Sequence, residues 1–418
     1  MIARIVIYSL ISCFFISCKN NVSTELGPFQ VGYAHQVITP TDTAFIAGHS
    51  HNRIFNGVND DIYVKAAVIS NGDGKLAILT FDCIGLLHPQ LMEIRQVVRE
   101  RIPDFPEQNI VMTSTHTHSG PDVVGLWGKN LTHSGVDPEY MDSLIEKSAR
   151  AIIQANDNLV SCSADYAISE HGHDWVYNIS EPDELDRSVN ILRFSNQGKN
   201  VLTMTNFACH PTFLDAVNDK VSSDYVGGYY ERMTETQGGG NLFIQGSIGG
   251  WVQPEHEEKT PKQAFFRGKE LADNVIQSLE QGIPLKGNDI KIKTSQFVMP
   301  LENPGFIMLS KAGVIDRDFS DSVGTEVAYF EIGNASFATH PGETVPELSK
   351  RTKALMQNEG PKFIVGLGMD ALGYILKPYF FDEERKVPHS GYLCSVSVGP
   401  QTEEYIYNEL QDLILNKQ

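Results

Sequence analysis

Short apolar runs alternate with longer amphipathic segments along this chain, and the alternation restricts the fold more than any other feature. The apolar runs are fringed by polar or glycine residues and rich in β-branched side chains, which indicates largely buried strands. They cover residues 64–70, 76–81, 109–114, 201–208, 241–245, 326–337 and 362–367. Helical periodicity covers residues 89–101, 137–155, 224–236, 261–281, 344–357 and 402–417. Strands that alternate with helices predict an α/β fold.

The predicted sheets are mixed rather than purely parallel, because a further strand-like run covers residues 289–298. We find no internal repeat, low-complexity tract or long Pro/Gly-rich linker in the 418 residues. We therefore expect layered mixed β-sheets flanked by helices, in one large domain over residues 31–418 that follows a short tether at 18–30.

The N-terminus has the form of a signal peptide. Arg4 is followed by an apolar run over residues 5–16, too short to span a bilayer, which takes about 20 residues. Ser17 and Cys18 then form a small-residue-and-cysteine pair typical of bacterial lipoprotein processing. Processing at Cys13 would leave an apolar region of fewer than about 7 residues. We expect a signal peptide over residues 1–17, export to the bacterial cell envelope and a lipid anchor at Cys18. A plain secretory signal is the alternative.

Charge and cysteine content exclude some partners. The formal charge is −19, with 52 acidic against 33 basic residues, which argues against nucleic-acid binding because such proteins carry basic patches. The later cysteines are widely spaced and form no CxxC pair, so they predict no metal site. Their positions are Cys83, Cys162, Cys209 and Cys394. Nothing in the sequence indicates an obligate protein partner.

Two histidines follow the predicted strand at 109–114. If the strand continues, His116 and His118 point to the same side, because side chains two apart share a face of a strand. Two imidazoles at a strand end suit metal binding or proton transfer, although hydrogen-bonded structural histidines are the alternative.

Two other predicted strands also end in potential metal ligands. His210 follows the run at 201–208, and His340 and Glu343 follow the end of another apolar run. Ligand-binding groups in α/β proteins collect beyond the carboxyl ends of strands. Zinc is bound by His nitrogen and carboxylate oxygen, and a catalytic zinc keeps one position for water. The pattern therefore predicts one site built from several strand ends.

These segments resemble motifs of the neutral, non-lysosomal ceramidases. Residues 114–121 are similar to the family's THTHSGP motif, 209–212 to its second histidine motif, 341–343 to its glutamate motif and 373–375 to its metal-tyrosine motif. The four motifs occur in the family's order. Residues 37–40 and 222–225 resemble further family segments, so the likeness covers most of the chain.

The resemblance implies a zinc-dependent hydrolase that cleaves the N-acyl amide of ceramide, or of a related acylated lipid, by metal-activated water. One Zn²⁺ per chain would be bound by His116, His210, Glu343 and Tyr374. His118 would lie beside the metal and handle a proton, while Tyr374 would also donate a hydrogen bond to the oxyanion. His340 is expected to be structural or to support a ligand.

The chain departs from the family in three places. Ceramidases carry Gly-Asp-Val-Ser-Pro where this chain has residues 250–254, so Trp251 replaces the aspartate and Gln253 replaces the active-site serine. Gln253 can donate and accept hydrogen bonds but cannot act as a nucleophile. Ser247 is a weaker candidate to replace the family's serine. Ile179 replaces an arginine of a substrate-contacting loop, for which Arg187 is a possible replacement. The family's C-terminal β-sandwich domain is also expected to be missing.

These departures leave alternatives open for function. One is a zinc hydrolase of another amide or of an ester, and another is a lipoprotein that binds lipid or glycan without catalysis. A second HxH pair, His49 and His51, lies in a glycine-flanked loop, where solvated histidines are the simpler expectation.

Overall fold

The computed structural model describes residues 27–255 and 258–415. The predicted signal peptide over 1–17, the anchor at Cys18 and most of the tether at 18–30 lie outside the described residues. No helix among the described residues is long and apolar enough to cross a membrane.

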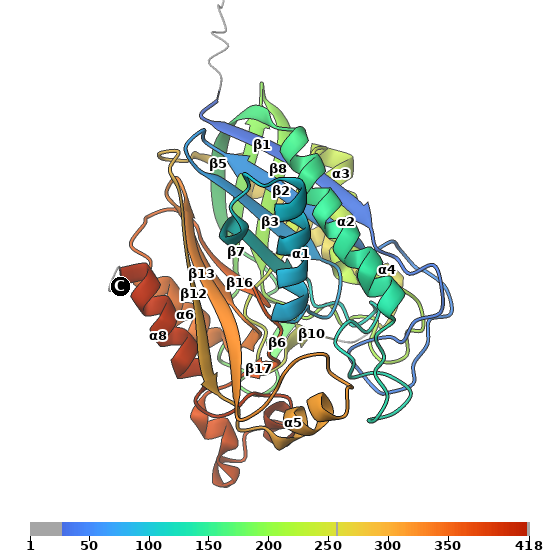
Figure 1. The fold of residues 1–418 in the computed structure, drawn as a ribbon. Coiled ribbons are helices and arrows are strands. Elements are labelled where there is room, and N and C mark those ends of the chain that lie inside the picture. The colour runs from blue at the N-terminus through green and yellow to red at the C-terminus, as the bar shows by residue number, and fades with distance from the viewer. Residues whose placement is uncertain (1–26, 256–257, 416–418) are drawn as a thin grey trace, which may run out of the picture.

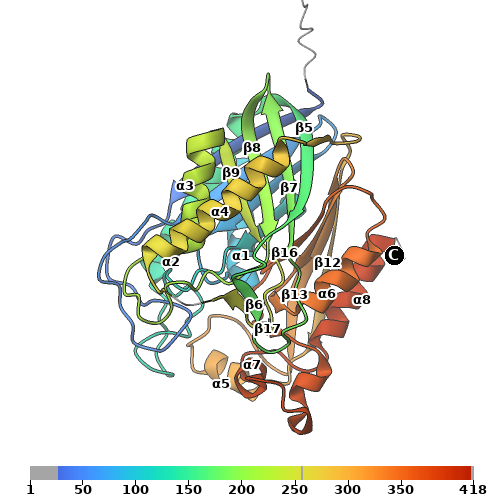
Figure 2. The same ribbon diagram turned by 180° about the vertical axis from the view of Figure 1, so that it is seen from behind.

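Two large β-sheets form the centre of the molecule (Figures 1 and 2). The nine-stranded sheet has the order β4-β3-β2-β1-β5-β7-β8-β9, with β11 paired to β5. Its strands are β1 (Phe29–Val37), β2 (Tyr63–Ser70), β3 (Lys75–Phe81), β4 (Ile110–Ser114), β5 (Val160–Glu170), β7 (Ser188–Asn196), β8 (Lys199–Phe207), β9 (Gly240–Gln245) and β11 (Ile283–Pro284). The four-stranded sheet has the order β12-β13-β14-β16, with β12 (Ile290–Pro300), β13 (Ser322–Ile332), β14 (Ala335–His340) and β16 (Lys362–Gly366).

Two short strand pairs lie beside these sheets. The antiparallel pair is β6 (Val176–Asn178) with β10 (Val252–Pro254), and the parallel pair is β15 (Glu343–Thr344) with β17 (Tyr374–Ile375). The helices are α1 (His88–Arg101), α2 (Pro138–Asp157), α3 (Tyr225–Gln237), α4 (Pro261–Leu279), α5 (Pro304–Lys311), α6 (Pro346–Leu355), α7 (Ser390–Ser395) and α8 (Thr402–Leu415).

The elements form four layers, in the order helices, sheet, sheet, helices. Apolar residues of both sheets make one buried cluster, which includes Phe194 from the large sheet and Phe337 from the smaller one. Helices α1 and α2 pack on β1 to β4, and α3 and α4 pack on the other half of the large sheet. Helices α6 and α8 cover the smaller sheet on its outer face. This confirms the predicted α/β fold with mixed, helix-flanked sheets.

Most predicted elements occur within a few residues of their expected bounds, but one prediction was wrong. The single strand expected over residues 326–337 is a hairpin, because β13 ends at Ile332 and β14 begins at Ala335. Gly333 has a φ of +54°, a left-handed conformation that glycine adopts readily, and this allows the reversal. The antiparallel partners Ile332 and Ala335 flank the turn.

Parallel pairing brings several carboxyl ends of strands to one region. Strands β3 and β4, β8 and β9, and β14 and β16 each pair in parallel. β9 also lies against β4 and β16, so the ends of the three pairs are neighbours. The loops that leave β4, β8 and β14 therefore meet.

Candidate metal centre and active site

His116 lies just beyond β4 in a constrained backbone conformation. The strand ends at Ser114 and does not continue through the two histidines. His116 has a φ of +70°, and its backbone N–H donates to the Cys83 carbonyl at 3.0 Å. Left-handed conformations of non-glycine residues are uncommon and cluster at functional sites. The ring Nδ1 lies 2.5 Å from the Ile84 carbonyl oxygen, which leaves Nε2 to face the site.

His210 follows β8 and is oriented in the same way. Its backbone N–H donates to the Val252 carbonyl at 2.9 Å, and its ring Nδ1 lies 2.8 Å from the same oxygen. A carbonyl oxygen only accepts, so Nδ1 carries the proton in both histidines. Each Nε2 is consequently available for a ligand or for a second proton.

Glu343 lies on β15 between the two rings. Its Oε2 is 3.0 Å from Nε2 of His210 and 3.4 Å from Nε2 of His116. Burial raises the pKa of Glu343, but the two histidines outweigh burial and hold its pKa at about 2. The carboxylate is therefore negatively charged and 6% exposed, with two imidazole nitrogens directed at it.

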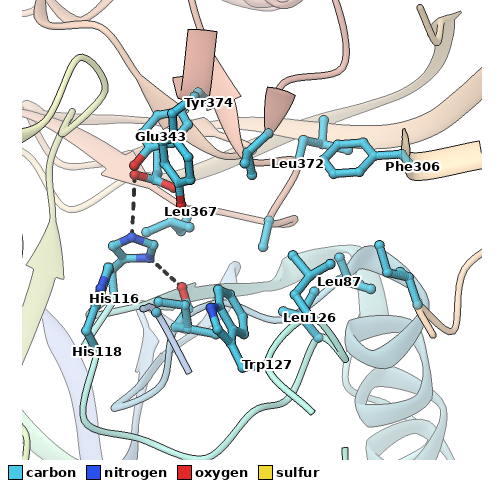
Figure 3. Close-up of a pocket in the computed structure, with 18 of the residues that line it drawn as sticks. Leu87, His116, His118, Leu126, Trp127, Phe306, Glu343, Leu367, Leu372 and Tyr374 are labelled. Atoms are coloured by element: carbon cyan, nitrogen blue, oxygen red, sulfur yellow. Dashed lines mark hydrogen bonds and ion pairs between the residues drawn. The ribbon is translucent and has the colours of Figure 1, made fainter. Parts of the chain in front are cut away.

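Tyr374 is the neighbour of Glu343 across a parallel strand pair, because β15 and β17 align these two residues. Its hydroxyl oxygen accepts a hydrogen bond from the Trp251 indole N–H at 2.6 Å. Burial, followed by the charge of Glu343, raises the pKa of Tyr374 well above its ordinary value. Figure 3 shows Tyr374 beside Glu343 and both opposite His116.

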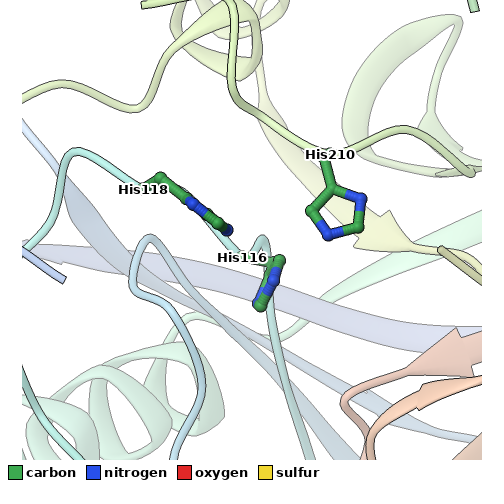
Figure 4. A group of neighbouring side chains, drawn as sticks. All are labelled: His116, His118 and His210. Carbon is green, nitrogen blue, oxygen red and sulfur yellow. The ribbon is translucent and has the colours of Figure 1, made fainter. Parts of the chain in front are cut away.

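His118 completes the group (Figure 4). Its ring centroid is 4.9 Å from that of His116 and 5.7 Å from that of His210. Both ring nitrogens are buried, and neither has a hydrogen-bond partner within the described part of the chain. Burial, and then the neighbouring His116, His49 and His210, lower the pKa of His118 well below its ordinary value. The imidazole is therefore neutral.

These residues have the chemistry of a metal site. Ring nitrogens of His116, His118 and His210 lie within 4.8 Å of one another. The two Nδ1 protons are fixed by carbonyls, so both Nε2 atoms face the carboxylate, and a bound cation in place of the Nε2 protons would satisfy all three groups. His116, His210 and Glu343 are thus brought together, with Tyr374 and His118 at their sides.

His49 belongs to the site, contrary to the expectation of a solvated loop histidine. Its ring centroid is 5.0 Å from that of His118, and its Nδ1 is 3.9 Å from an Asp215 carboxylate oxygen. The loop reaches this position at Gly48, which has a φ of +99°, and a Cβ there would lie 2.4 Å from Cγ of His118. Only glycine allows this approach. His51 is exposed, as expected.

The other sequence candidates lie around this group. Gln253 donates to the Tyr177 hydroxyl at 2.9 Å and is not among the residues that line the cavity beside Glu343. Ser247 is 2.8 Å from the Thr344 hydroxyl. His340 is fully buried, 2.8 Å from Thr344 and 3.1 Å from Thr352, and burial lowers its pKa to about 3. His340 is therefore structural in this fold.

Gln245 was not anticipated from the sequence. It ends β9, is fully buried, and donates from Nε2 to the Thr115 carbonyl at 2.8 Å and to the Cys209 carbonyl at 2.9 Å. Its Oε1 accepts from the Cys209 N–H at 3.2 Å. The amide thus joins the residue before His116 to the residue before His210. A polar residue that ends an otherwise apolar strand was the available signal.

An apolar cavity adjoins these residues. His116, His118, Glu343 and Tyr374 line one part of it, as they do in Figure 3. The remaining walls are mostly aliphatic and aromatic, and include Leu87, Leu126, Trp127, Phe306, Ile315, Phe319, Leu372 and Tyr392. A largely apolar pocket with a few convergent polar groups is the usual form of a small-molecule site.

Comparisons with known proteins agree with this architecture. A neutral ceramidase crystal structure from Pseudomonas aeruginosa superposes with a TM-score of 0.76 at 15% identity, over 94% of this chain and 75% of that chain. A structure described as ceramidase complexed with C2 gives a TM-score of 0.77 over the same shares. The chain has the neutral ceramidase fold. The resemblance found in the sequence motifs is thereby confirmed.

Curated sequences give weaker matches to the same family, and no family model matches. The chain is 21% identical to neutral ceramidase A of Dictyostelium discoideum over 263 residues, which are 57% of this chain and 36% of that protein. It is 22% identical to neutral ceramidase 1 of Arabidopsis thaliana over 273 residues, which are 56% of this chain and 34% of that protein. The matched region thus spans about a third of these relatives.

Proposed function

We propose that the chain is a metal-dependent hydrolase that cleaves the N-acyl amide of ceramide or of a related acylated lipid. The observation that carries the proposal is the convergence of His116 and His210 Nε2 on one charged carboxylate oxygen of Glu343, at the end of an apolar cavity. The fold supports the same reading, because neutral ceramidases share it.

His116, His210, Glu343 and Tyr374 are the residues that would hold the metal, with Zn²⁺ as the expected ion and one ion per chain. When bound, such an ion supplies Lewis acidity to the scissile carbonyl and to water. The backbone carbonyls of Ile84 and Val252 orient the two imidazoles, and this support would leave Nε2 of each ring to bind the ion.

The chain's own side chains would move the protons. His118 is neutral, so an unpartnered ring nitrogen can accept a proton from the attacking water and return it to the leaving nitrogen. The Tyr374 hydroxyl accepts the Trp251 N–H, which fixes its oxygen, and its own hydrogen bond is made with Glu343. We expect this proton to be donated to the developing oxyanion during the reaction. The apolar walls would exclude bulk water from the reacting atoms.

A zinc hydrolase of another amide or of an ester is the second candidate. It is favoured by Gln253, which stands where ceramidases have a serine and whose side chain is bonded to Tyr177. The export signal, the anchor at Cys18, the domain bounds and a location in the bacterial envelope are proposals from the sequence, and they would place the enzyme near a membrane substrate.

The test is release of fatty acid from a labelled ceramide by the purified protein, with added zinc and after chelation. We expect zinc-dependent release. Zinc-dependent cleavage of other amides or esters without cleavage of ceramide would favour the second candidate. A folded, zinc-loaded protein that cleaves neither class would overturn the proposal.

A further inference from the structure

Trp251 bonds the tyrosine of the candidate metal centre with a kind of group that differs from the family motif. Its indole N–H donates to the Tyr374 hydroxyl oxygen at 2.6 Å, a short distance for an N–H···O hydrogen bond. The motif that residues 250–254 resemble has an aspartate at this position. An ionised carboxylate only accepts hydrogen bonds, whereas an indole N–H only donates them. The tryptophan therefore brings to this position a group that can bond an oxygen ligand.

The backbone at Trp251 is held in an uncommon conformation. Gly250 and Trp251 have consecutive left-handed φ values of +76° and +60°. The Gly250 carbonyl accepts from the Ser180 N–H at 3.1 Å, and the Trp251 carbonyl accepts from the Ile179 N–H at 3.2 Å. Left-handed non-glycine residues persist where the surrounding structure fixes them, and they cluster at functional sites. The segment after β6 therefore fixes the conformation that places the indole against Tyr374.

Two further rings pack on the indole. The ring centroid of His389 lies 4.7 Å from that of Trp251, and the centroid of Tyr392 lies 5.4 Å from it. Tyr392 also lines the cavity, and its ring centroid is 6.3 Å from that of Tyr374. The indole is thus held by ring packing, while its N–H alone bonds the Tyr374 oxygen. The N–H can therefore be removed in an experiment that keeps the rings.

The Tyr374 hydroxyl makes two hydrogen bonds with different consequences for a metal. A phenolic hydroxyl both donates and accepts. It accepts from Trp251, and its own proton is bonded to Glu343, which lies beside it in Figure 3. A cation bound beside Glu343 would replace the second bond and leave the first in place. The Trp251 N–H would then fix the direction of the Tyr374 oxygen whether or not the metal is bound.

We propose that Trp251 is a positioning residue for the metal and acts through Tyr374: its N–H holds the Tyr374 oxygen in the direction that the cation needs, and the site binds metal more weakly without it. Groups that support a metal ligand typically contribute about 10- to 100-fold to metal affinity. The proposal rests on the proposed function for the presence of the metal but not for the reaction, so it can be tested without turnover.

The first test is zinc affinity, measured by competition with a chelator of known affinity. We expect Trp251→Phe to bind zinc about 10- to 100-fold more weakly. Incorporation of 3-benzothienylalanine at position 251 should give the same loss, because sulfur replaces the N–H while both rings remain. Trp175→Phe is the matched control and should leave zinc affinity unchanged. The Trp175 indole N–H is also buried, but it has no hydrogen-bond partner within the described part of the chain.

A second measurement separates a role through Tyr374 from a general effect on folding. In a Tyr374→Phe background, Trp251→Phe should cause little further loss of zinc affinity, because residues that act as one unit are not additive. The visible spectrum of the cobalt-substituted protein reports the geometry of the ligands. We expect this spectrum to change in both position-251 variants and to stay unchanged in Trp175→Phe.

Three results would overturn the inference. They are zinc affinity and a cobalt spectrum that are unchanged in both position-251 variants, an equal loss from Trp251→Phe with and without the Tyr374 hydroxyl, and an equal loss in Trp175→Phe. A wild-type protein that shows the expected zinc effects but cleaves no amide or ester would overturn the proposed function and leave this inference standing. A wild-type protein that binds no zinc would overturn both.

Discussion

At the scale of single residues, the candidate metal centre depends on side chains that lie behind it and do not line the cavity. Gln245 is the clearest case, because its amide bonds the chain on both sides of the site, at Thr115 and at Cys209. Replacing it by Leu would remove the partner of the Thr115 carbonyl and of the Cys209 N–H, while the Cys209 carbonyl would keep only the Tyr225 hydroxyl. Each buried group left without a partner costs about 1–3 kcal/mol. The loops that carry His116 and His210 would then separate.

Gln245→Leu is therefore expected to weaken zinc binding about 10- to 100-fold, the usual effect of losing support behind a ligand. Competition with a chelator of known affinity measures it. Gln253→Leu is the matched control, since Gln253 bonds only the Tyr177 hydroxyl among the described residues and should leave zinc affinity unchanged. Equal affinity in both variants would count against the role given to Gln245.

His118→Ala separates a proton-handling residue from a metal ligand. The His118 ring lies beside His116 and His210. The Nε2 atoms of His116 and His210, however, are directed at Glu343 and not at His118. We expect turnover to fall about 10²- to 10⁴-fold, the contribution of general acid–base catalysis, while zinc content stays at the wild-type value. Turnover within a few-fold of wild type at unchanged zinc content would rule out this assignment, and loss of zinc would make His118 a ligand.

At the scale of elements, close helix packing fixes the half of the large sheet that carries His210. Gly268 on α4 faces α3 so closely that a Cβ would lie 1.8 Å from the Tyr225 carbonyl oxygen. Gly268→Ala should destabilise the fold by about 1–3 kcal/mol, the usual cost of overpacking, although alanine is the better helix former. Denaturant unfolding measures the change. The control is Gly391→Ala on α7, where a Cβ meets nothing within 4 Å, and comparable losses in both variants would argue against tight packing here.

A buried ion pair joins helix α1 to the smaller sheet. Arg95 on α1 donates to both carboxylate oxygens of Glu326 on β13, at 2.8 and 2.9 Å. Burial raises the pKa of Glu326, but hydrogen bonds from His88 and Arg95 and the charge of Arg95 lower it to about 2. Because the folded pKa is depressed, this stability is present above about pH 4.5 and is lost as the pH falls toward 2.

Glu326→Gln should therefore be less stable than wild type at neutral pH, by about 3–5 kcal/mol if Arg95 is left as an unpaired buried charge. The difference should shrink between about pH 4.5 and 2, because only the wild type loses an ionised carboxylate there. Urea unfolding at several pH values measures both quantities. A difference that does not change with pH would show that the Glu326 charge is not the cause.

At the scale of the whole molecule, hydrophobic periodicity predicted the layers of the fold, and strand ends pointed to residues that the fold brings together in the candidate site. The apolar runs at 64–70 and 76–81 form β2 and β3, because short buried runs of β-branched and other apolar residues favour strands. Strands β1, β5 and β7 were missed, since strands of mixed composition carry a weak periodic signal. Parallel pairing joins strands that are far apart in the sequence. No local sequence pattern therefore shows which strand ends meet.

Local sequence patterns also predicted only part of the candidate site. His116, His210 and Glu343 were found because each follows an apolar strand. Tyr374 came only from the family resemblance. His49 was named but expected to be solvated, and Gln245 was not anticipated, because their positions arise from a loop approach at Gly48 and from contacts between the ends of three strands. Gln253 was predicted to act at the site, and that assignment stays a prediction.

The central claim is that one metal ion at His116, His210 and Glu343 makes this fold an amide hydrolase. The most direct measurement is the rate of N-acyl amide cleavage by the metal-free protein as Zn²⁺ is added stepwise, with bound zinc counted at each step. We predict that the rate rises in proportion to bound zinc and stops rising at one ion per chain. A rate that does not depend on bound zinc, or no cleavage of any acyl amide or ester at full occupancy, would contradict the account.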